Sequence, residues 1–319
     1  MLHHERLKPP TTDYPPDEWS LIEKHFRPEF MAQMESVLAL GNGYLGMRGI
    51  PEEGEPSVQN GTFVNGFYES WPIIYAEEAF GFARTGQTML NVTDSKIIKL
   101  FVDDEPFGLA TSNILYYCRQ LNMKSGTLDR EIIWETPSGR KVQIKSRRLI
   151  SFRQRHVACI SYEVTVLNDS APVVISSEMH APPREEQRTK DDPRKAKLIS
   201  GNVLRPRLSY SQNRRIVLCH STERSRMSLS CAIDHELESL CSHSYKTDHT
   251  ESSGQVAFTI EARPGVPIHL TKYMAYHTSK TAGVGEIGRL AEWTLDRVSG
   301  QGFAKLLSEQ EQYMSELAE

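Results

Sequence analysis

The clearest strand pattern in the sequence is His156-Val157-Ala158-Cys159-Ile160-Ser161-Tyr162-Glu163-Val164-Thr165-Val166-Leu167. Its even positions, from Ala158 through Ile160, Tyr162 and Val164 to Val166, form one apolar face. Successive side chains of a β-strand point to opposite faces of the sheet, so a period of two predicts a strand with one covered face.

The same alternation recurs in later segments, in which Met227, Leu229, Cys231 and Ile233 alternate with smaller or polar residues. A third set consists of Val256, Phe258 and Ile260. Repeated alternation is typical of antiparallel sheets with one covered and one wetter face. Helices of crossover length are not predicted between these strands, which disfavours a parallel α/β fold. We therefore predict a mainly β chain, built as a large antiparallel β-sandwich.

Turn signals separate the predicted strands. The apolar run Lys96–Val102 leads into Asp103-Asp104-Glu105-Pro106, and Thr136-Pro137-Ser138-Gly139 separates two short apolar runs as in a hairpin. Trp134, within the first of these runs, is predicted to lie in the core. Between residues 60 and 82, Pro72 and three glycines predict that no long element forms.

The C-terminal part changes to a helical period. From about Gly283 one predicted apolar face holds Ile287, Leu290, Ala291, Thr294 and Val298. Gly300 and Gly302 interrupt this pattern, and a second amphipathic helix then runs into residue 319 without a C-cap signal. We predict a β-sandwich domain over residues 1–278 and a helical linker over residues 279–319, with a further domain expected to follow.

Composition narrows the class of protein. The 319 residues are 39% hydrophobic and 24% charged, as in soluble globular chains, and the net charge of −4 predicts neither nucleic-acid nor anionic-membrane partners. Neither a signal peptide nor a run of 18 apolar residues is found, which predicts a cytoplasmic location. The five cysteines have no disulfide or zinc-ribbon spacing, which favours reduced, mostly buried thiols.

The glycine-rich stretch Leu40-Gly41-Asn42-Gly43-Tyr44-Leu45-Gly46-Met47-Arg48-Gly49 fits the dinucleotide pattern G-x-G-x-x-G. That motif requires a helix to begin at the third glycine, so that the helix N-terminus faces the phosphates. Pro51 and Pro56 follow closely and are incompatible with such a helix, and the acidic residues between them would repel a phosphate. A nucleotide site is therefore disfavoured.

The same stretch resembles the N-terminal domain of glycoside hydrolase family 65, which includes maltose, trehalose and kojibiose phosphorylases. The resemblance continues in order through Gly61–Glu69, Gln87–Val92, Val102–Phe107, Trp134–Gly139 and Ser176–Glu178. It implies a β-sandwich, a helical linker and then an (α/α)₆ barrel, which performs inverting phosphorolysis or hydrolysis of an α-glucoside. Inverting hydrolases pair an acid with a base that activates water.

The resemblance places the catalytic acid and the phosphate site in the barrel, and no position in these 319 residues matches them. We therefore predict no catalytic residue and no cofactor here, with inorganic phosphate as co-substrate of the complete family enzyme. The implied partners are the barrel, in cis or in trans, and an α-linked disaccharide, with a homodimer as a further possibility. A free-standing carbohydrate-binding or assembly module is the alternative function.

The best candidate for contact with sugar is the segment from Phe67 to Glu78. Aromatic faces pack on the C–H surfaces of sugars, and carboxylates accept hydrogen bonds from hydroxyl groups. On this ground we nominate Trp71, Tyr75, Glu77 and Glu78. The alternative role for the aromatic residues is to fill the core or the seam against the barrel.

Other chemistry receives little support from the sequence. Adjacent acidic pairs such as Glu52 and Glu53 are expected to point to opposite faces, so they are poor candidates for a converging acid and base. Cys241, His243 and His249 lie close together but do not make a four-ligand zinc set, so no metal site is predicted.

Overall fold

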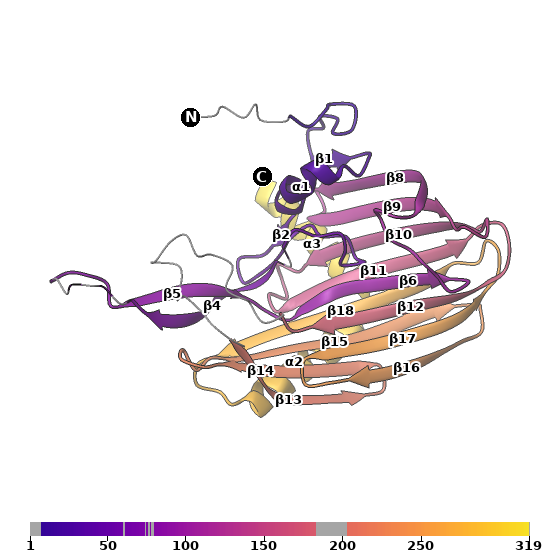
Figure 1. The fold of residues 1–319 in the computed structure, drawn as a ribbon. Helices are drawn as coiled ribbons and strands as arrows, with labels where there is room; N and C mark the ends of the chain where they lie inside the picture. Colours follow the sequence, from indigo (N-terminus) through magenta and orange to yellow (C-terminus); the bar gives the residue numbers. More distant parts are fainter. Residues whose placement is uncertain are drawn as a thin grey trace.

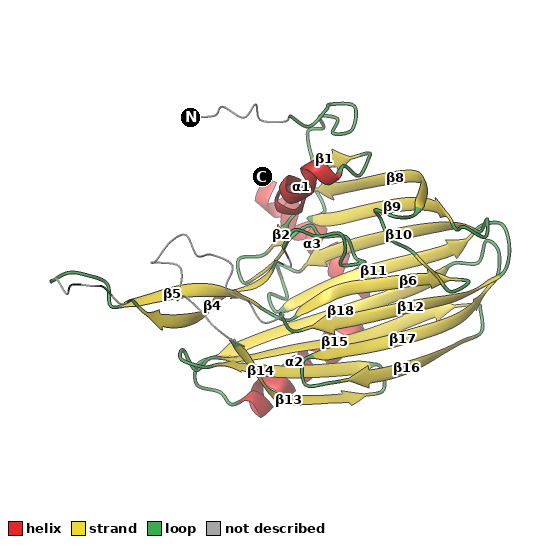
Figure 2. Cartoon of the chain, viewed as in Figure 1, coloured by secondary structure: helices red, strands yellow, loops and turns green. Residues whose placement is uncertain are grey.

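The computed structural model describes residues 8–59, 61–73, 75, 77, 80–182 and 203–318. Within these ranges, strands form three antiparallel sheets (Figures 1 and 2). The largest sheet has nine strands in the order β1-β8-β9-β10-β11-β18-β15-β14-β13. A five-stranded sheet, β16-β17-β12-β6-β7, faces it, and a four-stranded sheet, β2-β3-β4-β5, extends from one end. The predicted β-sandwich is confirmed.

The strands and helices of each sheet and layer have the following bounds. The nine-stranded sheet consists of β1 (Ser20–Glu23), β8 (Asn113–Asn122), β9 (Thr127–Glu135), β10 (Lys141–Ile150), β11 (Val157–Val166), β13 (Leu204–Gln212), β14 (Arg215–Thr222), β15 (Ser228–Ser239) and β18 (Ile268–Ser279). The five-stranded sheet consists of β6 (Asp94–Val102), β7 (Glu105–Pro106), β12 (Ala171–His180), β16 (His243–His249) and β17 (Ser253–Ala262). The remaining elements are β2 (Leu40–Gly41), β3 (Leu45–Met47), β4 (Thr62–Pro72), β5 (Thr85–Asn91), a 3₁₀ turn (Pro28–Phe30), α1 (Met31–Val37), α2 (Val284–Gln301) and α3 (Phe303–Ala318).

The main core lies between the two larger sheets. The even positions of β11, including Ile160 and Tyr162, point into it and pack with Ile175 of β12 and Phe258 of β17. Trp134 is buried in the same core, as predicted. Burial of this apolar surface drives the sheets together, at roughly 25 cal/mol per Å² removed from water.

The outer face of the nine-stranded sheet is covered in part by α2 and α3, which lie behind it in Figure 1. Val157 and Cys159, at odd positions of β11, are therefore buried against Leu295 and Leu306. The two helices meet at Gly302, whose φ of 78° favours glycine. The predicted helical period and its glycine interruption are both present.

One predicted position on the apolar face of α2 is wrong. Leu290 is exposed, whereas Ile287, Ala291, Leu295 and Val298 are buried. The buried stripe is centred near Ala291, so at 100° per residue Leu290 falls at its edge and turns towards solvent.

A second correction concerns residues 60–82. The glycines and Pro72 do not prevent a long element, because β4 runs for 11 residues to Pro72. Gly66 has a φ of 77°, and the pairing with β5 shifts register between Phe63 and Tyr68. Gly66 lies in a β-bulge, beyond which the strand continues. The resulting β4–β5 hairpin projects away from the sandwich (Figure 1).

A third correction concerns Glu52 and Glu53, which do not point to opposite faces. They lie in a turn rather than a strand, and both carboxylates reach Arg130, at 3.0 and 2.7 Å. Arg148 also contacts Glu52 at 2.7 Å, and all four side chains are buried. Coulombic attraction from Arg130 and Arg148 outweighs the effect of burial and lowers the pKa of Glu52 to about 2.

Among the residues whose positions are described, no helix is both long and apolar enough to cross a membrane. All five cysteines are unpaired thiols, and four of them are buried, as predicted.

Candidate functional site

Three of the four residues nominated for sugar contact, Trp71, Tyr75 and Glu77, belong to the projecting β4–β5 hairpin and the segment that joins its strands. The indole Nε1–H of Trp71 donates to Thr88 Oγ1 at 3.1 Å, and its ring lies against the backbone of Gly86. Tyr75 is 41% exposed and packs on Phe82, with ring centroids 4.8 Å apart. Glu77 is exposed, and Glu78 lies outside the described residues.

The base of this hairpin is fixed by Glu69. The buried carboxylate accepts hydrogen bonds from the backbone amides of Glu223, Arg224 and Ser225 at 2.7–3.1 Å, and from the amide of Ser70 at 2.8 Å. Burial alone would raise the pKa of Glu69, but these amides outweigh it and lower the pKa. The hairpin is thereby tied to the β14–β15 turn.

A separate cavity lies on the outer face of the nine-stranded sheet, beside the start of α3. We call it the outer-face groove; its volume is about 490 Å³. Its lining consists of Tyr116, Cys118, Gln120, Asp129, Arg130, Glu131, Lys145, Ser146, Arg147, Ser161, Glu163 and Phe303. Volumes of this size are common for small-molecule sites.

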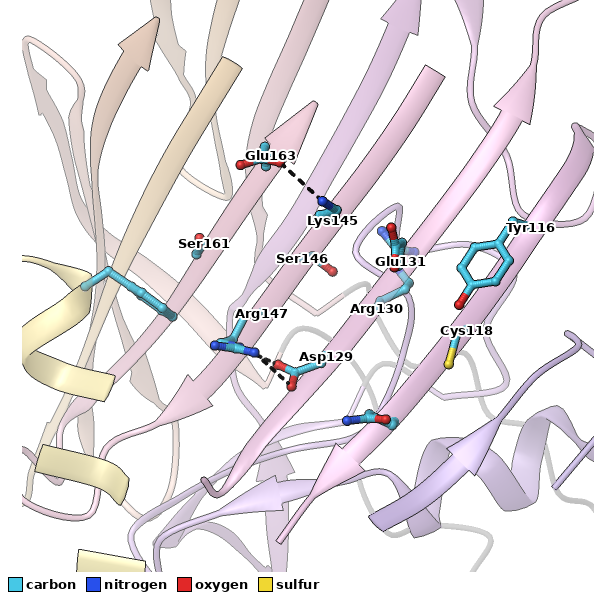
Figure 3. Close-up of a pocket in the computed structure, with 12 residues that line it drawn as sticks. Tyr116, Cys118, Asp129, Arg130, Glu131, Lys145, Ser146, Arg147, Ser161 and Glu163 are labelled. Atoms are coloured by element: carbon cyan, nitrogen blue, oxygen red, sulfur yellow. Dashed lines mark hydrogen bonds and ion pairs between the residues drawn. The ribbon is translucent and has the colours of Figure 1, made fainter. Parts of the chain in front are cut away.

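The floor of the outer-face groove is an ordered array of polar side chains (Figure 3). They occupy the outward positions of four adjacent strands, in two cross-strand rows set by the pairing register. The first row is Gln120, Asp129, Arg147 and Ser161, and the second is Cys118, Glu131, Lys145 and Glu163.

Several of these polar groups already have partners, and two of the partners lie outside the array: Gln143 donates to Glu131 at 2.7 Å, and Ser161 lies 2.6 Å from His269 Nε2. Arg147 forms two hydrogen bonds with Asp129, at 2.7 and 3.3 Å, and Lys145 lies 4.0 Å from Glu163. Figure 3 shows both pairs joining side chains of neighbouring strands, with Tyr116 and Cys118 on the strand next to that of Asp129. Tyr116 and Lys145 are exposed, whereas Arg130 points into the core towards Glu53.

In the described part of the chain, no group of three or more His, Cys, Asp or Glu side chains is arranged to hold a metal ion. Several buried acidic side chains instead form hydrogen bonds or ion pairs with basic side chains. Glu23 bonds Arg119 at 2.8 Å, and Glu178 contacts His180 and Lys99 at 2.9 and 2.8 Å. The carboxylates of Glu23 and Glu178 are thus each held by basic partners.

Comparison with known proteins identifies the family. The sequence profile described as "Glycosyl hydrolase family 65, N-terminal domain" matches residues 21–317, which is nearly the whole chain. The chain belongs to glycosyl hydrolase family 65. The resemblance carried by the glycine-rich stretch and the later motifs is thereby confirmed.

Curated relatives in family 65 are much longer than this chain. An α,α-trehalose phosphorylase of Thermoanaerobacter brockii is 33% identical over 306 residues, which is 95% of this chain and 39% of the relative. An uncharacterised glycosyl hydrolase of Mycobacterium leprae is 33% identical over 95% of this chain and 38% of its own length. A kojibiose phosphorylase of Halothermothrix orenii is 28% identical over 50% of this chain.

A solved structure, described as a putative kojibiose phosphorylase from human microbiome, shows the same fold. It superposes with a TM-score of 0.81 over 97% of this chain and 39% of that chain, at 17% sequence identity. The chain thus spans about two fifths of the length of the Thermoanaerobacter brockii and Mycobacterium leprae relatives and of the solved structure.

Sequence reasoning missed the outer-face groove and the Glu69 anchor. The groove residues come from four strands, and which outward positions meet depends on a register that no local pattern specifies. One signal was present, since Asp129 and Glu131 alternate with the buried residues Leu128 and Ile132, although the predicted apolar run began only at Ile132. Glu69 belongs to the segment Gly61–Glu69 that resembles family 65. Its hydrogen-bond partners in the β14–β15 turn lie more than 150 residues later, so the sequence did not reveal the contact.

Proposed function

We propose that residues 1–319 form the non-catalytic N-terminal β-sandwich of an inverting α-glucoside phosphorylase or glycoside hydrolase, and that they support a catalytic barrel in carbohydrate metabolism. The observation that carries this proposal is coverage: the sequence profile of the family's N-terminal domain matches residues 21–317, whereas the chain covers only 38–39% of two long relatives. The remaining three fifths of those relatives supply the barrel.

The chemistry of the described carboxyl groups supports a non-catalytic role. A general acid that protonates a glycosidic oxygen needs a raised pKa, as a carboxyl gains in an apolar pocket. The carboxyl groups with displaced pKa values here are Asp13, Glu52, Glu69 and Glu178, and all four are lowered. They are held as anions by donors, which suits structural ion pairs.

A docking surface for the barrel is available on the helical linker. The inner face of α2 is buried on the sheet, whereas Leu290 and Trp293 point outward, and Trp293 is 64% exposed. Leu317 on α3 is also exposed. Exposed large apolar side chains that gather on one element mark interaction sites. We place the barrel on this face, in cis or as a separate chain.

Association with the C-terminal remainder of the Thermoanaerobacter brockii trehalose phosphorylase, produced separately, tests this placement. Binding should weaken at least about tenfold in Trp293→Ala, because a central exposed tryptophan is a typical hot spot. Trp19→Ala is the matched control, since Trp19 is also exposed but precedes β1 at the opposite edge of the sheet. Equal binding by both variants, or no association of the wild-type chain, would contradict the placement.

The substrate and setting are part of the same proposal. The names of the relatives favour an α-linked disaccharide such as trehalose or kojibiose as substrate of the complete enzyme, with inorganic phosphate as co-substrate. We place the enzyme in the cytoplasm.

A second candidate function is carbohydrate binding by the hairpin, through Trp71, Tyr75, Glu77 and Glu78. The observation that favours it is the exposure of Tyr75 and Glu77 on an element that projects from the body. Titration with an α-linked disaccharide, followed by tryptophan fluorescence, should give a saturable change that Trp71→Phe removes. A flat titration up to millimolar sugar contradicts this candidate.

A further inference from the structure

The outer-face groove has no part in the function proposed above. It lies on the strands β8 to β11, whereas Leu290 and Trp293 lie on α2, which packs on β13, β14, β15 and β18. The groove is walled by Phe303 on one side and contains the exposed Tyr116 on the other. Two aromatic rings therefore flank a polar floor.

The spacing of the floor is regular, because strands impose it. Neighbouring strands lie about 4.8 Å apart, and outward residues of one strand are about 6.8 Å apart. Asp129 and Arg147 are direct cross-strand neighbours, and so are Lys145 and Glu163. The floor thus offers donors and acceptors alternately, at separations close to the width of a pyranose ring.

The charges exclude several classes of ligand. The outward side chains carry three carboxylates, Asp129, Glu131 and Glu163, against the two cations Lys145 and Arg147. An excess of acid disfavours nucleic acid and other polyanions. Five charged groups on the floor also disfavour the core of a protein interface, which is depleted in charge. An apolar ligand would remove water from these ion pairs without offering them hydrogen bonds in return, which costs free energy.

We propose that the outer-face groove binds a neutral oligosaccharide. A sugar hydroxyl both donates and accepts, so it can donate to Asp129 and accept from the Arg147 guanidinium beside it. The rings of Tyr116 and Phe303 present apolar faces to the C–H surfaces of the sugar. The ion pair between Arg147 and Asp129 holds both groups in place before the ligand arrives, which reduces the cost of ordering them.

Binding is expected to be weak. The groove is open, and its ion pairs are solvated, so each contact with sugar replaces a contact with water. We expect a Kd of about 1 mM for maltoheptaose.

The experiment uses the full chain with maltoheptaose as probe. Isothermal titration gives Kd, and saturation-transfer NMR identifies the sugar protons that touch aromatic rings. Tyr116→Ala and Arg147→Gln should each weaken binding about tenfold or more, whereas Tyr116→Phe should retain it because the ring remains. Both positions lie on the solvent side of the sheet, and unchanged thermal unfolding of each variant shows that it folds.

Three results would overturn the proposal. The first is an absence of saturable binding by the wild-type chain. The second is binding that Trp71→Ala abolishes and Tyr116→Ala leaves intact, which would assign the sugar to the β4–β5 hairpin. The third is binding of dextran sulfate in preference to maltoheptaose, which would make the ligand an anion. None of these results bears on barrel docking, which is read out separately through Trp293.

Discussion

The carboxylate of Glu69 accepts a hydrogen bond from the backbone amide of Ser225, 156 residues later in the chain, at 2.7 Å. The Ser225 hydroxyl returns a hydrogen bond to the carbonyl of Tyr68 at 2.6 Å. A two-stranded hairpin is marginally stable by itself in water. The direction of the β4–β5 hairpin therefore depends on this reciprocal contact with the β14–β15 turn.

Glu69→Gln should loosen the hairpin. The amide side chain keeps one acceptor oxygen but loses the charge, and hydrogen bonds to charged groups contribute about 1.5–3 kcal/mol each. We expect the free energy of unfolding to fall by about 1–3 kcal/mol. Hydrogen exchange in β4 and β5 should accelerate more than in β9 and β10. The same exchange pattern in Glu77→Gln, at the exposed tip, would argue against an anchoring role.

The effect of Glu69 should depend on pH. Its pKa is lower in the folded chain than its usual value, so its contribution to stability is present above about pH 4.3 and is lost as the pH falls through the folded pKa. The difference in unfolding free energy between wild type and Glu69→Gln should therefore shrink on acidification from pH 7. Urea titrations at several pH values measure this difference in unfolding free energy. A difference that grows towards low pH contradicts the prediction.

Arg130 should be among the residues most sensitive to substitution. Arg130→Met leaves Glu53 buried without its cation, and breaking a buried pair in this way costs about 3–5 kcal/mol. Arg147→Met is the matched control on the outer face of the same sheet, where its partly exposed pair with Asp129 contributes about 0–1 kcal/mol. Chemical denaturation measures the free energy of unfolding of both variants. Equal decreases in this free energy would contradict the structural role of the buried cluster.

Much of the sandwich was predictable, because apolar residues alternate in β11, β15 and β17, and these residues fill the core between the sheets. Burial on the opposite face, as at Cys159 and Ala232, depends on the helices that cover it. What the sequence could not provide was the meeting of distant segments. Glu52 and Glu53 were expected to diverge, since a strand would separate them, but a turn brings both to Arg130. Leu290 fits a helical stripe by spacing, and only the packing of α2 on the sheet shows that it lies at the edge.

Two leucines of α2 should differ in how strongly the same substitution lowers stability. Leu295 is fully buried against the nine-stranded sheet, so Leu295→Ala should cost about 2–5 kcal/mol through lost burial and a cavity. Leu290 is exposed, and Leu290→Ala should change stability by no more than about 0.5 kcal/mol. Thermal unfolding of both variants measures the contrast. Similar losses would mean that α2 packs differently from the arrangement described.

The most direct test of the central claim is an assay for turnover by the purified chain. The chain is incubated with inorganic phosphate and, in turn, with trehalose, kojibiose and maltose, and the release of glucose and glucose 1-phosphate is measured. We predict no release above the level of a buffer control, because our proposal places the catalytic acid in the barrel, outside these residues. Release that persists at constant specific activity through successive purification steps would contradict the claim.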